Sequence, residues 1–247
     1  MISASLKGKK ILVTDVLHFA GPGLTKGLVE LGATVLCHDD DFQDSEKRQV
    51  FVDENPVALI AEATDAKALA AEALERLGEV DVLINNDAYP APRIPVDEIK
   101  PEDLRGAFER LVFRGFELTG ALVPHMKERG SGRVIFVTSA GPISGIPDYT
   151  IYASARSAVN GMIKSLAMEL GPHGISVNAI APNYLANPDY YPPELMAKPG
   201  VAEKILKRIP LGRLGEQEEA AALIAFLAGD HSGFVTGQVI PFAGGWA

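Results

Sequence analysis

Three polar side chains in the middle of the chain have types and spacings suited to proton transfer. Ser139 follows a β-branched run, Tyr152 comes thirteen residues later, and Arg156 lies four residues beyond Tyr152. Positions i and i+4 of a helix share a face, so Tyr152 and Arg156 should lie side by side. The guanidinium would favour the phenolate and lower the tyrosine pKa, which suits a general base. Ser139 could donate a hydrogen bond to the same substrate oxygen. The alternative is a tyrosine that only packs its ring, but the place of Ser139 at a strand end favours catalysis.

The first strand–helix turn, residues 14–23, lacks most of what a dinucleotide needs. Such a turn uses glycines so that backbone amides reach a pyrophosphate at a helix N-terminus. Only Gly21 and Gly23 remain here, and their alternative role is to shape a tight turn. The carboxylate of Asp15 would repel a diphosphate, and the ring of Phe19 would fill the space it needs. This turn therefore predicts that no nicotinamide cofactor binds.

The elements that must position these residues alternate along the chain. Short apolar runs are typical of buried parallel strands, at Ile11–Thr14, Thr34–Cys37, Val57–Ile60, Val80–Asn85, Val134–Thr138, Ser176–Ile180 and Gln238–Phe242. Segments with helical periodicity lie between most of them, at Gly23–Leu31, Ala66–Leu77, Pro101–Arg129, Tyr152–Leu170 and Gln217–Ala228. The pattern predicts one Rossmann-like, doubly wound α/β domain over residues 1–247, with a parallel seven-stranded sheet flanked by helices.

The segment Ala181–Pro199 is the least regular part of the chain. It contains five prolines and three tyrosines, and it follows the sixth predicted strand. Ligands of doubly wound folds bind beyond the carboxyl ends of the strands, so we expect this segment to form a lid or pocket wall. A rigid surface loop without function is the alternative.

Composition restricts the partners of the protein. The 247 residues carry 23 Lys+Arg and 32 Asp+Glu, a formal charge of −9, and the pI is near 5.1. This acidity argues against nucleic acid or an anionic membrane as the main partner. A single cysteine, Cys37, and the absence of a leader or membrane-span pattern lead us to expect a cytoplasmic protein.

No metal site is expected from the five scattered histidines, which show neither HxH nor HExxH spacing. The run His38-Asp39-Asp40-Asp41 lies where a nucleotide-binding relative would contact a ribose. We interpret it as a solvated acidic turn.

Taken together, the motifs resemble the short-chain dehydrogenase/reductase family over essentially the whole chain. The resemblance rests on Ser139…Tyr152-Ala-Ser-Ala-Arg156, Asn85-Asn86-Asp87-Ala88 and Thr236-Gly237-Gln238. There are three departures from that family. That family has a T-G-x-x-x-G-x-G turn, and the conserved positions of this turn hold Thr14, Asp15, Phe19 and Gly21 here. Two of the three glycines are therefore replaced. Its catalytic lysine is Arg156 here, and its helix asparagine falls on Leu111.

The departures are similar to those of halohydrin dehalogenases, a cofactor-free branch of that fold. Two marks, T-x4-F-x-G and S-x12-Y-x3-R, are both met without a gap. The resemblance implies that Ser139 and Tyr152 hold the substrate hydroxyl and that Arg156 lowers the tyrosine pKa. Tyr152 would remove the proton, and the alkoxide would displace the neighbouring halide to give an epoxide. Small anions would open epoxides in the reverse reaction.

The leaving halide needs a weakly solvating pocket with a few hydrogen-bond donors. The resemblance places it at Pro182-Asn183-Tyr184-Leu185, with the backbone N–H groups of Tyr184 and Leu185 as donors. The walls would be Phe19, Pro182, Asn183 and Tyr191. For Tyr190 we prefer ordinary loop packing. Asp87 could hold the halide loop or be a plain turn aspartate.

Two other functions remain open at this point: a nicotinamide-dependent dehydrogenase with a degenerate turn, and an inactive ligand-binding relative. The resemblance further implies a homotetramer that assembles through the helices Pro101–Arg129 and Tyr152–Leu170. Whether Trp246 reaches the pocket of a neighbouring subunit is left open.

Overall fold

The computed structural model describes residues 5–247, and its centre is a seven-stranded sheet in which all strands are parallel. The strand order is β3-β2-β1-β4-β5-β6-β7. The strands are β1 (Lys10–Val13), β2 (Thr34–Cys37), β3 (Leu59–Ile60), β4 (Val82–Asn85), β5 (Gly132–Val137), β6 (Ile175–Pro182) and β7 (Val239–Phe242). The order reverses between β1 and β4, as in a doubly wound fold. The predicted Rossmann-like architecture is confirmed.

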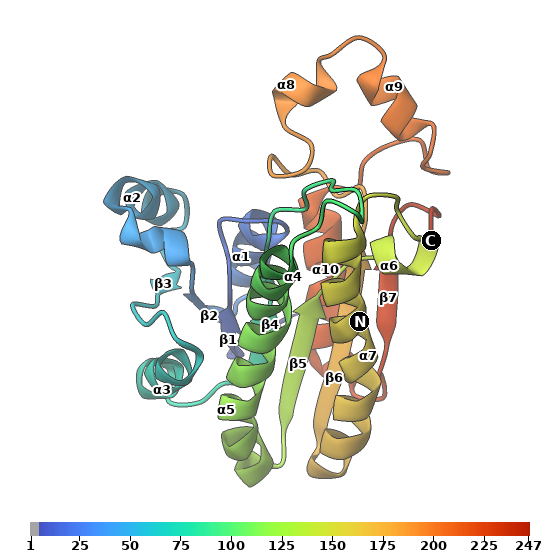
Figure 1. Cartoon of the computed structure of the whole chain (residues 1–247). Coiled ribbons are helices and arrows are strands. Elements are labelled where there is room, and N and C mark those ends of the chain that lie inside the picture. The colour runs from blue at the N-terminus through green and yellow to red at the C-terminus, as the bar shows by residue number, and fades with distance from the viewer. Residues whose placement is uncertain (1–4) are drawn as a thin grey trace.

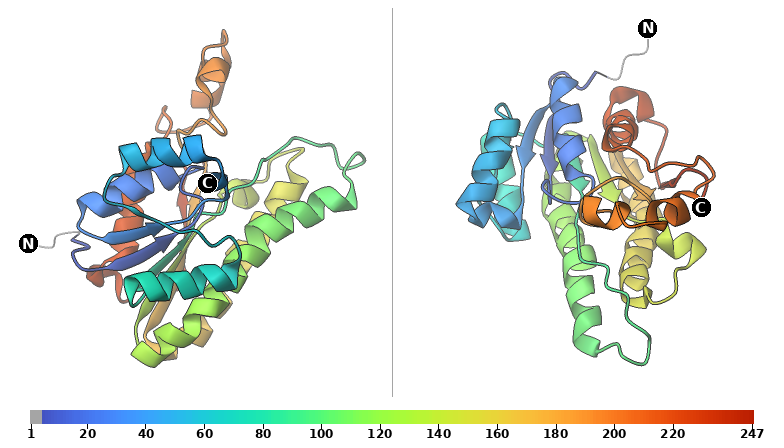
Figure 2. Two further views of the ribbon diagram at one scale, coloured as in Figure 1. Left: turned by 90° about the vertical axis from the view of Figure 1, so that its left-hand side faces the viewer. Right: turned by 90° about the horizontal axis from the view of Figure 1, so that it is seen from above.

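Helices cover both faces of this sheet (Figures 1 and 2). On one face α1 (Gly21–Glu30) packs beside α10 (Gln217–Ala228), and on the other α3 (Ala66–Leu77), α5 (Arg114–Arg129) and α7 (Thr150–Leu170) pack over the strands. The remaining elements are short or peripheral: η1 (Asp40–Gln43), α2 (Ser45–Glu54), α4 (Pro101–Phe108), η2 (Glu109–Phe113), α6 (Gly141–Ser144), η3 (Gly171–His173), α8 (Pro193–Met196), α9 (Val201–Leu206) and η4 (Asp230–Ser232).

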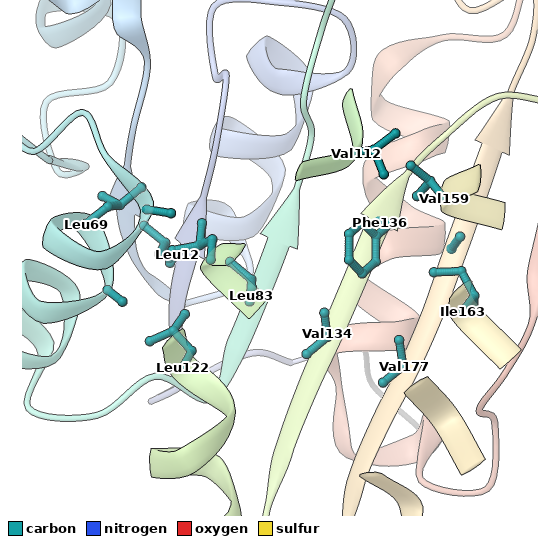
Figure 3. Packing of buried hydrophobic residues seen from close by; sticks show 14 of the residues in the cluster. Leu12, Leu69, Leu83, Val112, Leu122, Val134, Phe136, Val159, Ile163 and Val177 are labelled. Carbon is teal, nitrogen blue, oxygen red and sulfur yellow. The ribbon is translucent and has the colours of Figure 1, made fainter. Parts of the chain in front are cut away.

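Most strand residues are apolar, and those that face the α3–α5–α7 layer form one core with its helices. Figure 3 shows strand residues such as Leu83 and Phe136 facing Leu122 and Ile163 of the helices. Every residue of β4 is buried, because helices shield the sheet from both sides. Removal of this apolar surface from water is the main stabilising contribution, about 25 cal/mol per Å² buried.

Capping residues set the ends of the helices. Asp65 caps α3 by accepting hydrogen bonds from the backbone N–H groups of Lys67 and Ala68, and Gly78 ends the helix with a φ of +76°. The predicted helix Pro101–Arg129 is continuous through α4, the π-helical turn η2 and α5. It ends at Gly130 in the left-handed conformation.

The carboxyl ends of the strands face one end of the molecule. Ser139 follows β5 there, and the chain that leaves β6 carries α8 and α9 beyond the edge of the sheet (Figure 1). This arrangement agrees with the expected lid or pocket wall. Within residues 5–247, no helix combines the length and apolar character that a membrane crossing requires.

Candidate active site

The first turns of α7 place Tyr152 and Arg156 in the interior. Arg156 is 1% exposed, and its two terminal nitrogens donate hydrogen bonds of 3.0 Å to the carbonyl oxygen of Val137 and of 2.8 Å to that of Asp87. Val137 is the last residue of β5 and Asp87 lies two residues after β4, so the carboxyl ends of the strands hold the guanidinium. The Cζ atom lies 5.2 Å from the centre of the Tyr152 ring.

Arg156 keeps its charge despite complete burial. Burial alone would lower the pKa of the guanidinium, but Tyr152, Tyr190 and Asp87 outweigh burial and raise that pKa. The Nε atom has no hydrogen-bond partner within residues 5–247. A fixed positive charge therefore lies beside the Tyr152 ring.

Ser139 lies at the carboxyl end of β5 and lines the same cavity as Tyr152. Its Oγ accepts a hydrogen bond of 3.0 Å from the backbone N–H of Gly141. This bond orients the hydroxyl and leaves its proton available for a substrate oxygen. Asn160, one helical turn beyond Arg156, donates to the carbonyl oxygen of Ser139 at 3.3 Å.

The cavity has a volume of about 810 Å³ and collects most of the predicted site residues. Those that line it are Ser139, Tyr152, Phe19, Asn183, Tyr184, Leu185 and Tyr191. Arg156 and Pro182 are buried behind this wall. Pro182 accepts a hydrogen bond of 3.1 Å from the backbone N–H of Ala140, which joins the ends of β6 and β5.

The turn after β6, at which the sequence predicts a halide, has an unusual backbone. Tyr184 adopts a φ of +59°, and the backbone of Gly215 pairs with the carbonyl oxygen of Tyr184 and the N–H of Ala186. The N–H of Leu185 points away from that pairing and has no acceptor within the described residues. The N–H of Tyr184 faces the Tyr191 phenol, whose pKa burial raises. A halide at this turn would meet donors and apolar walls.

Tyr190 has a more central place than the sequence indicated. Its ring lies edge-on to Phe19 at 5.6 Å and to Tyr152 at 6.4 Å between ring centres, and its hydroxyl donates to the carbonyl oxygen of Tyr89 at 3.1 Å. Burial raises the pKa of this phenol well above its usual value, so Tyr190 stays neutral. It lines the cavity, and no feature of the local sequence distinguishes it from an ordinary loop tyrosine.

An ionic contact ties the β1–α1 turn to the segment after β6. Asp189 accepts a hydrogen bond of 2.8 Å from the backbone N–H of Phe19, and its other oxygen lies 3.6 Å from Nδ1 of His18. This bond raises the pKa of His18 to about 9. We call the His18–Asp189 pair the turn latch. It holds Phe19 and Tyr190 against each other.

The β1–α1 turn does not fit a dinucleotide. Protein acceptors already engage its amides: Leu17 N–H donates to Asp39, Phe19 N–H to Asp189, and Gly23 N–H to the side chain of Gln217. A pyrophosphate would have to displace these bonds and approach two carboxylates.

Asp15 forms buried ion pairs in the same region. Its buried carboxylate accepts two hydrogen bonds of 2.9 Å from Arg110 and one of 2.8 Å from the N–H of Ala88. Arg114 lies 3.8 Å away and also pairs with Asp40. Burial raises the pKa of Asp15, and Arg114 offsets part of this rise. The ion pairs fill the space with protein groups.

The interpretation of His38–Asp41 as a solvated acidic turn is wrong for its first half. His38 and Asp39 are buried, and the carboxylate of Asp39 accepts hydrogen bonds from the N–H groups of Leu17 and Asp41. Burial, followed by repulsion from Arg114, lowers the pKa of His38 to about 4, so this imidazole is neutral. Burial raises the pKa of Asp39 to about 6.

Asp87 is also buried, and its carboxylate accepts a hydrogen bond of 3.2 Å from the hydroxyl of Thr14. Burial and then repulsion from Asp15 raise the pKa of Asp87 to about 7. Its carbonyl oxygen, rather than its carboxylate, accepts from Arg156. Asp87 thus contacts Thr14 after β1 and Arg156 of α7, and neither bond involves the turn after β6.

Within residues 5–247, one group of side chains could meet around a metal ion, namely His18, Asp39 and Asp41. Its oxygens already accept protein hydrogen bonds, from Leu17 to Asp39 and from Lys47 to Asp41. This arrangement does not favour a metal.

Trp246 lines the cavity of its own chain. Its ring lies edge-on to that of Tyr184, with 5.5 Å between ring centres. The indole thus supports the turn after β6 from within the same chain.

The sequence and fold of this chain are similar to those of known proteins. The family model described as enoyl-(acyl carrier protein) reductase matches residues 21–247. A 3-oxoacyl-[acyl-carrier-protein] reductase of Thermotoga maritima is 33% identical, covering 97% of this chain and 98% of the relative. A 2,3-dihydroxy-2,3-dihydro-p-cumate dehydrogenase of Pseudomonas putida is 32% identical, covering 97% and 95%.

Two solved structures are more similar in sequence than these reductases. One, described as a dehalogenation enzyme, has a TM-score of 0.94 and 47% identity, covering 98% of this chain and 99% of the other. The other is halohydrin dehalogenase HheC bound to ethyl (2S)-oxiran-2-ylacetate, with a TM-score of 0.91 and 37% identity over 95% and 96%. The chain belongs to the halohydrin dehalogenases of the short-chain dehydrogenase/reductase family. It is a carbon–halogen lyase, as its motifs predict.

Proposed function

We propose that this halohydrin dehalogenase closes vicinal haloalcohols to epoxides with Tyr152 as the base. Ser139 donates a hydrogen bond to the substrate hydroxyl oxygen, and Tyr152 phenolate accepts the hydroxyl proton. The alkoxide electron pair then forms the new C–O bond as the C–halogen bond breaks, and the halide leaves with the bonding pair. Tyr152 returns its proton to water. In the reverse direction, Tyr152 protonates the epoxide oxygen while an anion attacks carbon.

The halide is proposed to leave into the turn after β6. The free N–H of Leu185 and the N–H of Tyr184 supply donors, and Phe19, Asn183 and Tyr191 exclude bulk water. Weak solvation and a few donors suit a large monovalent anion. HheC carries an epoxide in its solved complex, which supports epoxides and haloalcohols as the small-molecule partners of this chain.

One observation carries this proposal: a buried, permanently charged Arg156 lies beside Tyr152. A second supports it, since Asp15 and its ion pair with Arg110 lie in the turn that a nucleotide would need. The rival function, a nicotinamide-dependent dehydrogenase, is favoured by the names of the reductase relatives. It requires a nucleotide, and the β1–α1 turn does not fit one.

The test follows bromide release and proton release from a vicinal bromo-alcohol, without added cofactor, and separately titrates NADH by fluorescence. We expect bromide and epoxide in equal amounts and no NADH binding at micromolar concentrations. NADH binding with no bromide would favour the dehydrogenase. Neither signal would indicate an inactive ligand-binding relative.

We also propose that the protein is a cytoplasmic homotetramer that works without nucleic acid or membrane partners. Exposed apolar residues on the expected interface helices support assembly, namely Phe113, Phe116 and Met168. The negative charge of the chain and its single buried thiol, Cys37, support the location and the absence of anionic partners.

A further inference from the structure

The outer part of the active-site cavity has a charge opposite to that of the whole chain. Arg93, Lys204 and Arg208 line it, whereas the chain carries a net charge of −9. Among the residues that line the cavity in the described chain, 5–247, none is Asp or Glu. The cations are thus gathered at the cavity without the acidic partners that accompany most other cations of this protein.

One wall of this outer part is a single face of α9 and the residues that follow it. Val201, Lys204, Ile205 and Arg208 occupy positions i, i+3, i+4 and i+7, and all four line the cavity. Positions with this spacing share one helix face. The face therefore directs two apolar side chains and two cations at the same space. Lys207 lies outside this face and does not line the cavity.

A second wall brings the third cation from a distant part of the sequence. Arg93 comes from the connection between β4 and α4, and its guanidinium lies 4.9 Å from the ring centre of Tyr149. Within the described residues, neither Arg93 nor Lys204 nor Arg208 forms an ion pair with a carboxylate. Stacking on Tyr149 holds Arg93 at the cavity and leaves its donors free.

No cationic side chain lines the inner part of the cavity. The residues that line it are Phe19, Ser139, Tyr152, Leu185 and Tyr190. The charge of Arg156 is fully buried and directed at two backbone carbonyls. The cavity is therefore divided into a reacting end without a cation on its wall and an outer end with three cations. Its volume of about 810 Å³ exceeds what a small haloalcohol and a halide require.

We propose that the enzyme selects vicinal haloalcohols and epoxides that carry a carboxylate at the end remote from the reacting carbons. The carboxylate binds between Arg93 and the cationic face of α9, while the hydroxyl or epoxide oxygen binds at Ser139 and Tyr152. Guanidinium groups bind carboxylates in bidentate geometry, and ammonium groups add a point charge. This inference rests on the proposed function and names the substrate class of the same site.

The experiment compares ring closure of two matched series of terminal chlorohydrins. In one series an alkyl chain of increasing length ends in a carboxylate, and in the other the same chain ends in a primary amide. Ring closure is used because its nucleophile is the substrate's own oxygen. Binding of a free anionic nucleophile by the three cations therefore cannot affect the measured rate. We expect the carboxylates to have kcat/KM values about tenfold higher than the amides at the best chain length, with the difference in KM. Added salt should reduce this preference.

The triple variant Arg93→Gln, Lys204→Gln, Arg208→Gln should raise KM for the carboxylates and leave the amides unchanged. Lys207→Gln is the control, since it removes a cation that directly follows α9 and does not line the cavity, and it should retain the preference. Equal kcat/KM for both series, or equal losses for both in the triple variant, would overturn the inference while chloride release still supports the proposed function. Absence of chloride release from every chlorohydrin would instead contradict the proposed function itself.

Discussion

At the scale of single residues, the site depends on an arginine whose position the sheet determines. Both terminal nitrogens of Arg156 donate to carbonyl oxygens at the ends of β5 and β4, so the side chain cannot swing away from Tyr152. A lysine has a single nitrogen and a different reach, and it would not reproduce both bonds. Arg156 is thus a positioning residue that acts through the phenol.

The variant Tyr152→Phe should lose at least about a hundredfold in the rate of halide release, because it removes the proposed base. The fold should persist, since the ring and its contacts with Tyr190 remain. Bromide release and thermal unfolding of the two proteins check this. As a matched control, Tyr149→Phe alters a neighbouring cavity tyrosine and should keep most activity. A Tyr152→Phe enzyme with most of its activity would show that another group takes the proton.

The sequence predicted the catalytic residues better than their surroundings. Ser139, Tyr152 and Arg156 could be found because their spacing along one strand end and one helix is local. The pairing of Asp15 with Arg110 spans 95 positions, and no local pattern indicates it. The same holds for Tyr190 and for the cations of the outer cavity, which only the folded chain brings together.

At the scale of elements, backbone strain is concentrated in two turns around the cavity. Among non-glycine residues of the described chain, positive φ angles occur at Asp15, Phe19, Asp148 and Tyr184. Two of these, Phe19 and Tyr184, line the cavity directly. Such conformations cost about 1–3 kcal/mol each and are found where a precise backbone direction is required. Here they direct a ring and amide groups at the proposed halide position.

Crystals soaked in bromide should show an anomalous peak between Phe19 and the turn 182–185, within reach of the Leu185 N–H. That N–H has no acceptor in the described chain, so an anion there gains a donor without breaking a bond. Leu185→Pro removes the donor and is expected to weaken bromide inhibition. Peaks confined to surface lysines would refute this position.

The turn latch should make stability depend on alkaline pH. The pKa of His18 is raised to about 9 by its bond to Asp189, above the ordinary 6.5. The stabilisation is therefore complete below pH 6.5, falls as the pH rises, and is lost as the pH passes about 9. Asp39 and Asp41 also face His18, so Asp189→Asn should flatten this dependence without abolishing it.

Thermal unfolding midpoints of the wild type and Asp189→Asn, measured from mildly acidic to alkaline pH, test the latch. Glu194→Gln is the control, because it neutralises an exposed carboxylate of the same segment. Parallel curves for the wild type and Asp189→Asn would mean that the pair has no role in stability.

The regular elements could be predicted because their apolar periodicity is strong. The bounds of β2, α3 and α10 agree with the sequence pattern, whereas α2, α8 and α9 were not predicted. The helix α2 buries only Phe51, so it has almost no apolar face. Prolines begin α8 rather than interrupt it, since Pro193 occupies its first turn.

At the scale of the whole molecule, a fold shared with reductases has its nucleotide turn filled by internal ion pairs. Asp15 and Asp40 bind Arg110, which lies within the π-helical turn η2, and Arg114, which directly follows that turn. These contacts connect the β1–α1 turn and the segment after β2 to the long helix 101–129. The cavity beyond them remains available for substrate and halide.

Assembly should depend on the exposed apolar residues of the helices α5 and α7. Phe116 is 53% exposed and Met168 is 71% exposed, so Phe116→Glu with Met168→Glu should reduce the molar mass measured by light scattering from a tetramer to a smaller species. Phe234→Glu is a control, as this exposed residue lies outside both helices. An unchanged mass in the double variant would contradict this interface.

The most direct test of the tyrosine–arginine mechanism is a pair of pH–rate profiles, one for ring closure and one for epoxide opening. Closure requires Tyr152 as phenolate and should rise with pH to a plateau, whereas opening requires the protonated phenol and should favour lower pH. Arg156→Lys should shift the rise of closure to higher pH, and Arg156→Met should shift it further, because the charge beside the phenol changes and is then lost. A closure profile that is flat, or that does not move when Arg156 is neutralised, would contradict the mechanism even if halide is released.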